Sequence, residues 1–188
     1  MVCTRVFRES DLLMANNVPP TAMGKVTVHL TRWVRDFFVN SIAASKLATP
    51  LIRVPIYKAY GLDVHTHTIF PGCYFDSKRV SIGTKTVVWN DCYFGDRVTI
   101  GSGCAIAREV SFQTSSHEIN DGLRRVGANI LAPIIVGDGT WIGTRVTVLP
   151  GVSIGEGCVI GAGSLVTRDC EPNSLYFGSP ARLVKRLP

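Results

Sequence analysis

Residues 113–133 make a polar stretch in a chain that is largely apolar on either side of it. The stretch holds His117, and an imidazole in such a setting can take a proton from a hydroxyl group near neutral pH. Glu118 beside it can orient the ring. A solvated loop histidine is the simpler interpretation of the same residues, so residue type alone leaves catalysis open.

His65 and His67 are a second candidate, because two residues separated by one position on a strand share a face. Such a pair is half of a metal site, and zinc would need a third ligand. The one histidine further along the chain is His117, so a carbonic-anhydrase-like metal hydratase remains an alternative. The simpler interpretation is that the pair lines the first turn of the fold, and we expect no bound metal.

Trp141 and the basic end of the chain indicate binding surfaces. Trp141 is too large for a narrow β-helix interior, so we expect it to point outward. Arg182, Lys185 and Arg186 can hold a phosphate, although an ordinary solvated end explains them as well. The formal net charge of +6 predicts attraction to anions, which include nucleic acid, lipid headgroups and phosphorylated cofactors.

A repeat of six residues must position these side chains. Aliphatic residues recur at this spacing near the end of the chain, and glycine often follows them; the members are Val136, Ile142, Val148, Ile154, Ile160 and Val166. A helix repeats its apolar face about every 3.6 residues and a half-buried strand about every 2. A spacing of six therefore indicates a parallel β-helix, an all-β fold built from short strands.

The same register runs upstream of the polar stretch, with Asp76 as its polar exception. Its apolar members are Val64, Phe70, Ile82, Val88, Phe94, Ile100, Ile106 and Phe112. Phe112 and Val136 are 24 residues apart, a multiple of six. Residues 113–133 are therefore expected to be a loop inserted into a coil that resumes in step, and loops on rigid scaffolds often carry function.

The repeat divides the chain into three expected parts. Residues 1–61 form an N-terminal arm and an amphipathic helical cap, residues 62–170 form the β-helix with its inserted loop, and residues 171–188 form a basic tail. The helix is predicted from apolar residues at helical spacing, namely Leu30, Trp33, Val34, Phe37 and Phe38. We expect this apolar face to cover the open end of the coil. The alternative is that the 26–46 helix lies on a membrane surface.

The cysteines favour a reducing environment. Cys92, Cys104 and Cys158 each lie two residues before a register position, where the repeat elsewhere has valine, so they fill small inward sites. No CxxC pair is present, which argues against a zinc site or a disulfide framework. The sequence shows neither a signal peptide nor an apolar run long enough to span a bilayer. We expect a cytoplasmic protein.

The chain resembles the hexapeptide-repeat acyltransferases, and within them the maltose/galactoside O-acetyltransferase branch and its exopolysaccharide-modifying relatives. The blocks that carry the resemblance are TSSH (114–117), GDGTWIG (137–143), LPGVSIG (149–155), GAGSLVTRD (161–169) and GSPAR (178–182). The resemblance implies a left-handed β-helix, a homotrimer with active sites between subunits, and acetyl-CoA as the acyl donor. The phosphates of acetyl-CoA would then be the anions that the positive charge attracts, in place of nucleic acid.

The resemblance also implies roles for individual residues. His117 is the implied general base on an acceptor hydroxyl of a sugar, glycan or glycosylated metabolite, and the backbone N–H of Thr144 the implied oxyanion donor. The implied acetyl-CoA contacts are Trp141, Thr144, Ala162, Thr167, Arg168, Arg182 and Lys185. The implied acceptor residues are Asn90 and either Asp91 or Asp96, in a segment shorter than in many relatives. A non-catalytic solenoid that serves as a binding subunit is a further alternative.

Overall fold

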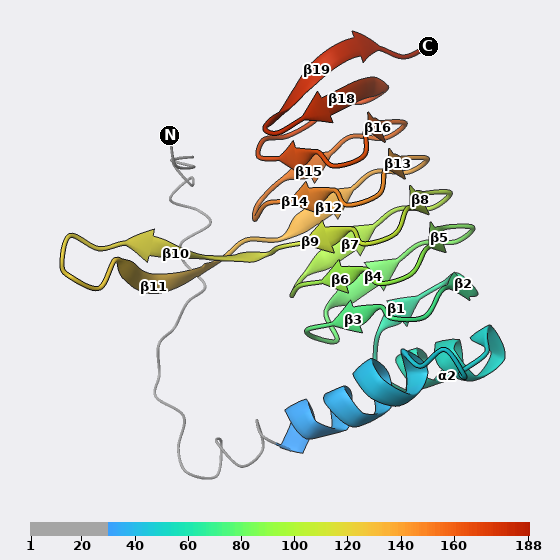
Figure 1. The fold of residues 1–188 in the computed structure, drawn as a ribbon. Coiled ribbons are helices and arrows are strands. Elements are labelled where there is room, and N and C mark those ends of the chain that lie inside the picture. Colours follow the sequence, from blue (N-terminus) through green and yellow to red (C-terminus); the bar gives the residue numbers. More distant parts are fainter. Residues whose placement is uncertain (1–29) are drawn as a thin grey trace.

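A coil of short parallel strands forms most of the molecule, as Figure 1 shows. The computed structural model describes residues 30–188; the expected N-terminal arm and the start of the 26–46 helix lie outside this range. Each turn of the coil adds one strand to each of three parallel sheets, so five complete turns stack on one another. The repeat of six thus gives the β-helix expected from the sequence.

The three sheets run along the length of the coil. The first contains β1 (Asp63–Val64), β4 (Val80–Ile82), β7 (Val98–Ile100), β12 (Ile134–Val136) and β15 (Ser153–Ile154). The second contains β2 (Thr68–Ile69), β5 (Val87–Val88), β8 (Ala105–Ile106), β13 (Trp141–Ile142) and β16 (Val159–Ile160). The third contains β3 (Tyr74–Phe75), β6 (Tyr93–Phe94), β9 (Ser111–Phe112), β14 (Thr147–Val148) and β17 (Leu165–Val166).

The register of six is correct from β4 onward and wrong in the first turn. Ile69 and Phe75 are the buried residues there, whereas Phe70 is half-buried and Asp76 is exposed. The corner after β1 is one residue shorter than the repeat predicts, and the corner after β3 is one residue longer, so Ile82 returns to the register. Asp76 is therefore a corner residue, which explains the polar exception.

Stacked side chains fill the interior of the coil. Phe94 lies between Phe75 and Phe112, with ring centroids 4.9 and 5.2 Å apart, in one ladder of the third sheet. The positions two residues before the register are also buried, and their cysteine members Cys92, Cys104 and Cys158 are free thiols. Their small side chains fit the narrow interior beside the corners.

The insertion forms a two-stranded hairpin that projects from the coil (Figure 1). Its strands are β10 (Ser115–Ile119) and β11 (Val126–Leu131), which pair antiparallel. The next coil strand, β12, stacks directly on β7, with Val136 opposite Ile100. The coil therefore resumes in step after the insertion. At the far end, β18 (Ser174–Gly178) extends the second sheet and β19 (Ala181–Arg186) pairs antiparallel with it.

Residues 30–60 form two helical segments that lie across the other end of the coil. We call these segments the helical layer. Residues 30–34 are α-helical and continue into the π-helical segment η2 (Arg35–Ala43). The second helix is α2 (Pro50–Tyr60), which starts with proline in its first turn and ends at Gly61 in a left-handed conformation, φ 103°. No helix within residues 30–188 is long and apolar enough to cross a membrane.

The orientation of the first helical segment differs from the expectation. Its predicted apolar face, with Leu30, Trp33, Phe37 and Phe38, is exposed, and Arg35, Val39 and Ala43 face the coil instead. The side toward the coil is held by polar contacts: the Asn40 side chain donates to the carbonyl oxygen of Phe75 and accepts from its N–H, at 3.1 and 2.9 Å. These polar contacts act beside apolar ones. Val39, Ala43 and Tyr57 are buried in the same core as the coil, and the Tyr57 ring centroid lies 4.9 Å from that of Phe75.

Arg53 of α2 joins the helical layer to the coil. It is only 1% exposed. Its guanidinium donates to four carbonyl oxygens, those of Ala43 (2.6 Å), Ser45 (2.9 Å), Ala48 (2.6 Å) and Ile69 (2.7 Å). Three of these carbonyls lie at the end of η2 and in the loop after it, where the helix has no further N–H groups to offer. Arg53 therefore caps one helix from the other.

Candidate active site

His117 lies on the projecting hairpin, in the centre of β10. Its Nδ1 is 3.3 Å from the carbonyl oxygen of Gly127 on the neighbouring strand. A carbonyl oxygen can only accept, so this contact requires the hydrogen on Nδ1. The Nε2 atom then carries the free lone pair, and the imidazole is set to accept a proton there.

One face of the hairpin turns toward a cavity at its base. Ser115 pairs with Leu131, and His117 with Asn129. Paired residues point to the same face, as do residues two apart on a strand. His117 therefore shares a face with Ser115, Asn129 and Leu131, and all three of those line a cavity of about 790 Å³. His117 itself is not among the residues that line the cavity in one chain, but the hairpin pairing puts it on the same face as three that do.

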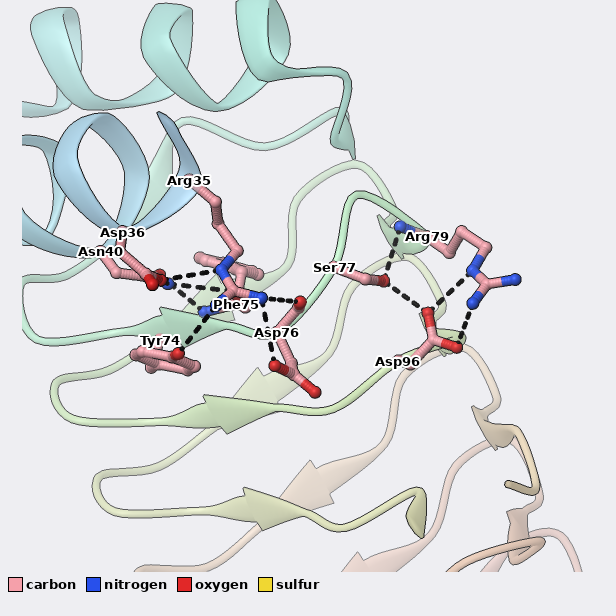
Figure 2. A network of polar contacts seen from close by, with 9 residues as sticks. All are labelled: Arg35, Asp36, Asn40, Tyr74, Phe75, Asp76, Ser77, Arg79 and Asp96. Atoms are coloured by element: carbon pink, nitrogen blue, oxygen red, sulfur yellow. Dashed lines mark hydrogen bonds and ion pairs between the residues drawn. The ribbon is translucent and has the colours of Figure 1, made fainter. Parts of the chain in front are cut away.

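A network of charged side chains forms the opposite wall of the cavity, shown in Figure 2. Asp96 accepts from Ser77 Oγ at 2.6 Å and from Arg79 Nε at 2.8 Å, and Arg97 Nε lies 3.5 Å from its other oxygen. Its side chain is 9% exposed. Hydrogen bonds and ion pairs with two arginines hold the Asp96 carboxylate in position. Asp96 can therefore fix the wall of the cavity or orient a ligand.

The second half of the network connects the wall to the helical layer. Arg35 donates to the backbone carbonyl of Asp76 at 2.5 Å and to the Asp36 carboxylate at 2.8 Å. Its hydrogen bond lowers the pKa of the Asp36 carboxyl. Arg35 also lies within 3.4 Å of the Tyr74 hydroxyl. These contacts fix where the helical layer borders the cavity.

The expected acceptor residues lie on two different edges of the coil. Asp96 follows β6, on the edge between the third and first sheets that also bears the hairpin; we call this the hairpin edge. Asn90 follows β5, on the edge between the second and third sheets, and does not line the cavity. Its carbonyl accepts from Glu109 N–H in the turn stacked next to it, at 3.0 Å. One chain does not bring Asn90 and Asp96 together.

The edge that bears Asn90 also carries two of the residues assigned to the acyl donor, and we call it the Thr144 edge. Thr144 follows β13 and Ala162 follows β16, and Gly163 N–H donates to the Thr144 carbonyl at 2.8 Å. The amide of Ala162 lies so near Gly143 that a Cβ on that glycine would come within 2.6 Å of it. Trp141, on β13 beside this edge, points outward and is 56% exposed.

Two of the residues assigned to the cofactor phosphates lie at one cavity near β18 and β19. Arg168 and Arg182 line a small cavity of about 120 Å³ together with Tyr176. Thr167 precedes Arg168 in the corner after β17. Lys185 lies on β19 with Arg182 but does not line this cavity. Two guanidinium groups at one small cavity suit a phosphate by charge and geometry.

The three histidines of the metal alternative are dispersed. His65 lies just after β1, with Nε2 at 2.7 Å from the Asp63 carboxylate, and His67 lies in the same corner. His117 is on the hairpin, which leaves the coil two turns further along. Within residues 30–188 no group of three or more potential metal ligands gathers. Within one chain, these three histidines therefore do not supply the three ligands of a zinc site.

Sequence reasoning missed the cavity wall. Arg35, Ser77, Lys78 and Arg79 line it, and no motif or spacing in the sequence indicates them as site residues. The one available signal was Asp76, the polar residue at a register position. A break in the repeat marks a corner of irregular length, and irregular corners are where a solenoid can place side chains around a ligand.

Comparison with known proteins agrees with this architecture. Residues 133–168 match the bacterial transferase hexapeptide (six repeats) family. A putative acetyltransferase of Staphylococcus aureus (strain COL) is 44% identical over 111 residues, which are 58% of this chain and 56% of that protein. This chain thus spans about half the length of that relative. The galactoside O-acetyltransferase of Escherichia coli K12 is 32% identical over 153 residues, or 81% of this chain and 68% of that protein.

A solved structure of a galactoside acetyltransferase in complex with coenzyme A has the same fold. It superposes with a TM-score of 0.72 at 27% sequence identity, over 91% of this chain and 86% of that one. The fold and the repeat define a left-handed β-helix of hexapeptide repeats. The chain belongs to the hexapeptide-repeat acetyltransferase family, with a galactoside O-acetyltransferase among its relatives.

Proposed function

We propose that this protein is an acetyl-CoA-dependent O-acetyltransferase that acts on a hydroxyl group of a sugar, glycan or glycosylated metabolite. The observation that carries the proposal is the placement of His117 on the hairpin face that lines the large cavity, with Nε2 free to accept a proton. Family membership supports the acetyl donor, because relatives named as acetyltransferases share the fold and one was solved with coenzyme A.

The proposed reaction needs one proton transfer and one oxyanion donor. The acceptor hydroxyl attacks the thioester carbonyl carbon of acetyl-CoA while His117 Nε2 takes the hydroxyl proton. The backbone N–H of Thr144 donates to the oxygen that becomes negative. The carbon–sulfur bond then breaks, and the imidazolium returns the proton to the sulfur. The products are the acetyl ester and coenzyme A, and no metal takes part.

The proposed active site lies between two copies of the chain. His117 and Asp96 are on the hairpin edge, whereas Asn90, Trp141 and Thr144 are on or beside the Thr144 edge. A homotrimer in which the hairpin edge of one copy faces the Thr144 edge of the next would unite the two sets. All residues of β10 are exposed in one chain, which supports such a contact.

The cavity wall favours a polyhydroxylated acceptor. Its lining includes hydrogen-bonding groups from Ser77, Arg79, Ser115 and Asn129, together with the Asp96 carboxylate. Sugar hydroxyls both donate and accept hydrogen bonds, so they match such a mixed set. In this proposal Asp96 orients the acceptor, Asn90 of a neighbouring copy completes the site, and Trp141, Ala162, Thr167, Arg168, Arg182 and Lys185 bind the donor.

The test compares two histidines. His117→Ala is expected to lower turnover by about 100-fold or more while coenzyme A still raises the melting temperature. The matched control is His67→Ala, because His67 is also exposed but lies in the first corner of the coil; its turnover should equal wild type. Undiminished turnover in His117→Ala would remove His117 as the base. A wild-type protein that coenzyme A does not stabilise would instead favour a non-catalytic solenoid.

A further inference from the structure

The outer face of the helical layer is apolar and uncovered within residues 30–188. Trp33 stacks on Phe37 there, with ring centroids 5.4 Å apart, and Phe38 meets Phe37 edge to face at 5.0 Å. Leu47 and Leu51 in and after the connecting loop are 90% and 85% exposed. The other large apolar residues exposed on this layer are Leu30, Ile42 and Ile52. A contiguous apolar patch of this kind marks a contact surface.

Two lysines supply the positive charge that the layer offers away from the cavity. Residues 30–60 contain five arginines and lysines. Arg35 and Arg53 are buried toward the coil, and Arg32 lines the cavity. Lys46 and Lys58 are the exposed cations that remain.

We propose that the helical layer binds the surface of an anionic lipid bilayer. Aromatic and aliphatic side chains can enter the headgroup boundary while lysines at the margin contact the lipid phosphates. Figure 1 shows the layer at the end of the coil opposite β18 and β19, so its outer face is directed away from the rest of the described molecule. A flat surface can therefore reach it without meeting the coil.

Charge favours lipid over a second copy of the chain as the occupant. Two copies in contact through this face would bring Lys46 and Lys58 of each toward those of the other. Like charges across an interface are unfavourable, whereas anionic headgroups complement them. The proposal is independent of the chemistry at His117, because it uses the side of the layer that faces away from the cavity.

The test measures sedimentation of the full chain with vesicles of phosphatidylcholine, alone or mixed with phosphatidylserine. We expect binding to the mixed vesicles, weaker at high salt, and little binding to phosphatidylcholine alone. The triple variant Trp33→Ser, Phe37→Ser, Leu51→Ser should bind at least about tenfold more weakly. Leu123→Ser is the matched control, since Leu123 is an equally exposed leucine at the hairpin tip, and should bind as wild type.

The contribution of charge is tested separately. Replacing Lys46 and Lys58 with glutamine should weaken binding to the mixed vesicles by about fivefold for each side chain removed. Lys85→Gln, at an exposed corner of the coil, should have no effect. Turnover with a soluble acceptor should stay at the wild-type level in all these variants, which confirms that they fold and separates this test from the catalytic one.

Three results would overturn the proposal. The first is no sedimentation with the mixed vesicles, and the second is equal binding to both kinds of vesicle. The third is a larger assembly in solution that the triple variant dissociates, because the occupant of the face would then be a second copy of the chain.

Discussion

The coil and the helical layer differ in which side chains they bury and which they expose. In the coil, aliphatic and aromatic residues point inward at regular positions, as Phe94 does, and the polar residues are at the corners. In the helical layer, Arg35 and Arg53 are buried and Trp33 and Phe37 are exposed. The coil packs apolar side chains in every turn, whereas the layer joins its end through buried arginines together with apolar residues such as Val39 and Tyr57.

The difference shows what amphipathic patterns can and cannot establish. In a β-helix, the strand direction and the stacking of turns leave one possible inside, so an apolar register identifies the buried side chains. A helix with an apolar face has an inside only when it is known what it packs against. Part of the contact between the helical layer and the coil is made to carbonyl oxygens at the open end, and those groups call for donors such as Arg35, Asn40 and Arg53.

The strongest expected contrast comes from the same substitution in the two regions. Phe94→Ala should lower the free energy of unfolding by about 3–5 kcal/mol, because it opens a cavity between two stacked rings. Phe37→Ala should lower it by less than about 1 kcal/mol, because the ring is already 45% exposed. Urea unfolding of both variants measures the difference. Equal losses would mean that the aromatic face of the layer is buried in the protein in solution.

The second contrast uses arginine. Arg53→Met should lower the free energy of unfolding by about 2–3 kcal/mol, since four carbonyl oxygens lose their buried donor. The control is Arg145→Met, which removes an exposed coil arginine paired with Glu109 at 2.7 Å and should leave the free energy of unfolding close to the wild-type value. Urea unfolding again provides the measurement. A loss at Arg53 no greater than that at Arg145 would show that the layer is held by apolar packing.

The fold was predictable from the sequence wherever the corners have equal length. From Ile82 to Val166 every register residue is buried, and the coil resumes in step after the hairpin. The first turn was mispredicted at Phe70 because one corner is a residue shorter and a later corner is a residue longer. A pattern at fixed spacing cannot detect two changes that cancel. The insertion was predicted as a loop, although its residues pair as two strands that project from the coil.

The candidate site was predictable in its residues but only partly in its arrangement. His117 stood out because it is a histidine in a polar insertion, and the structure adds its pairing with Asn129, a residue that lines the cavity. Asn90 and Asp96 are six residues apart, yet they lie on different edges, because each corner turns the chain to a new sheet. The contact of Arg35 with Asp76 joins residues 41 positions apart, and no local pattern indicates it.

The smallest expected effect concerns the pH dependence of stability. It comes from a buried cysteine of the coil and has no counterpart in the helical layer. Burial raises the pKa of the Cys170 thiol from about 9 to about 12. Because the pKa of this thiol is higher in the folded state, its contribution to stability is fully present below about pH 9. That contribution is lost as the pH rises from about 9 toward about 12. Between pH 7 and about 10, the free energy of unfolding should therefore fall by roughly 1 kcal/mol more in wild type than in Cys170→Ala. Residues 30–60 contain no cysteine, so this part of the alkaline loss belongs to the coil, and identical pH profiles for the two proteins would show that the thiol is accessible to water.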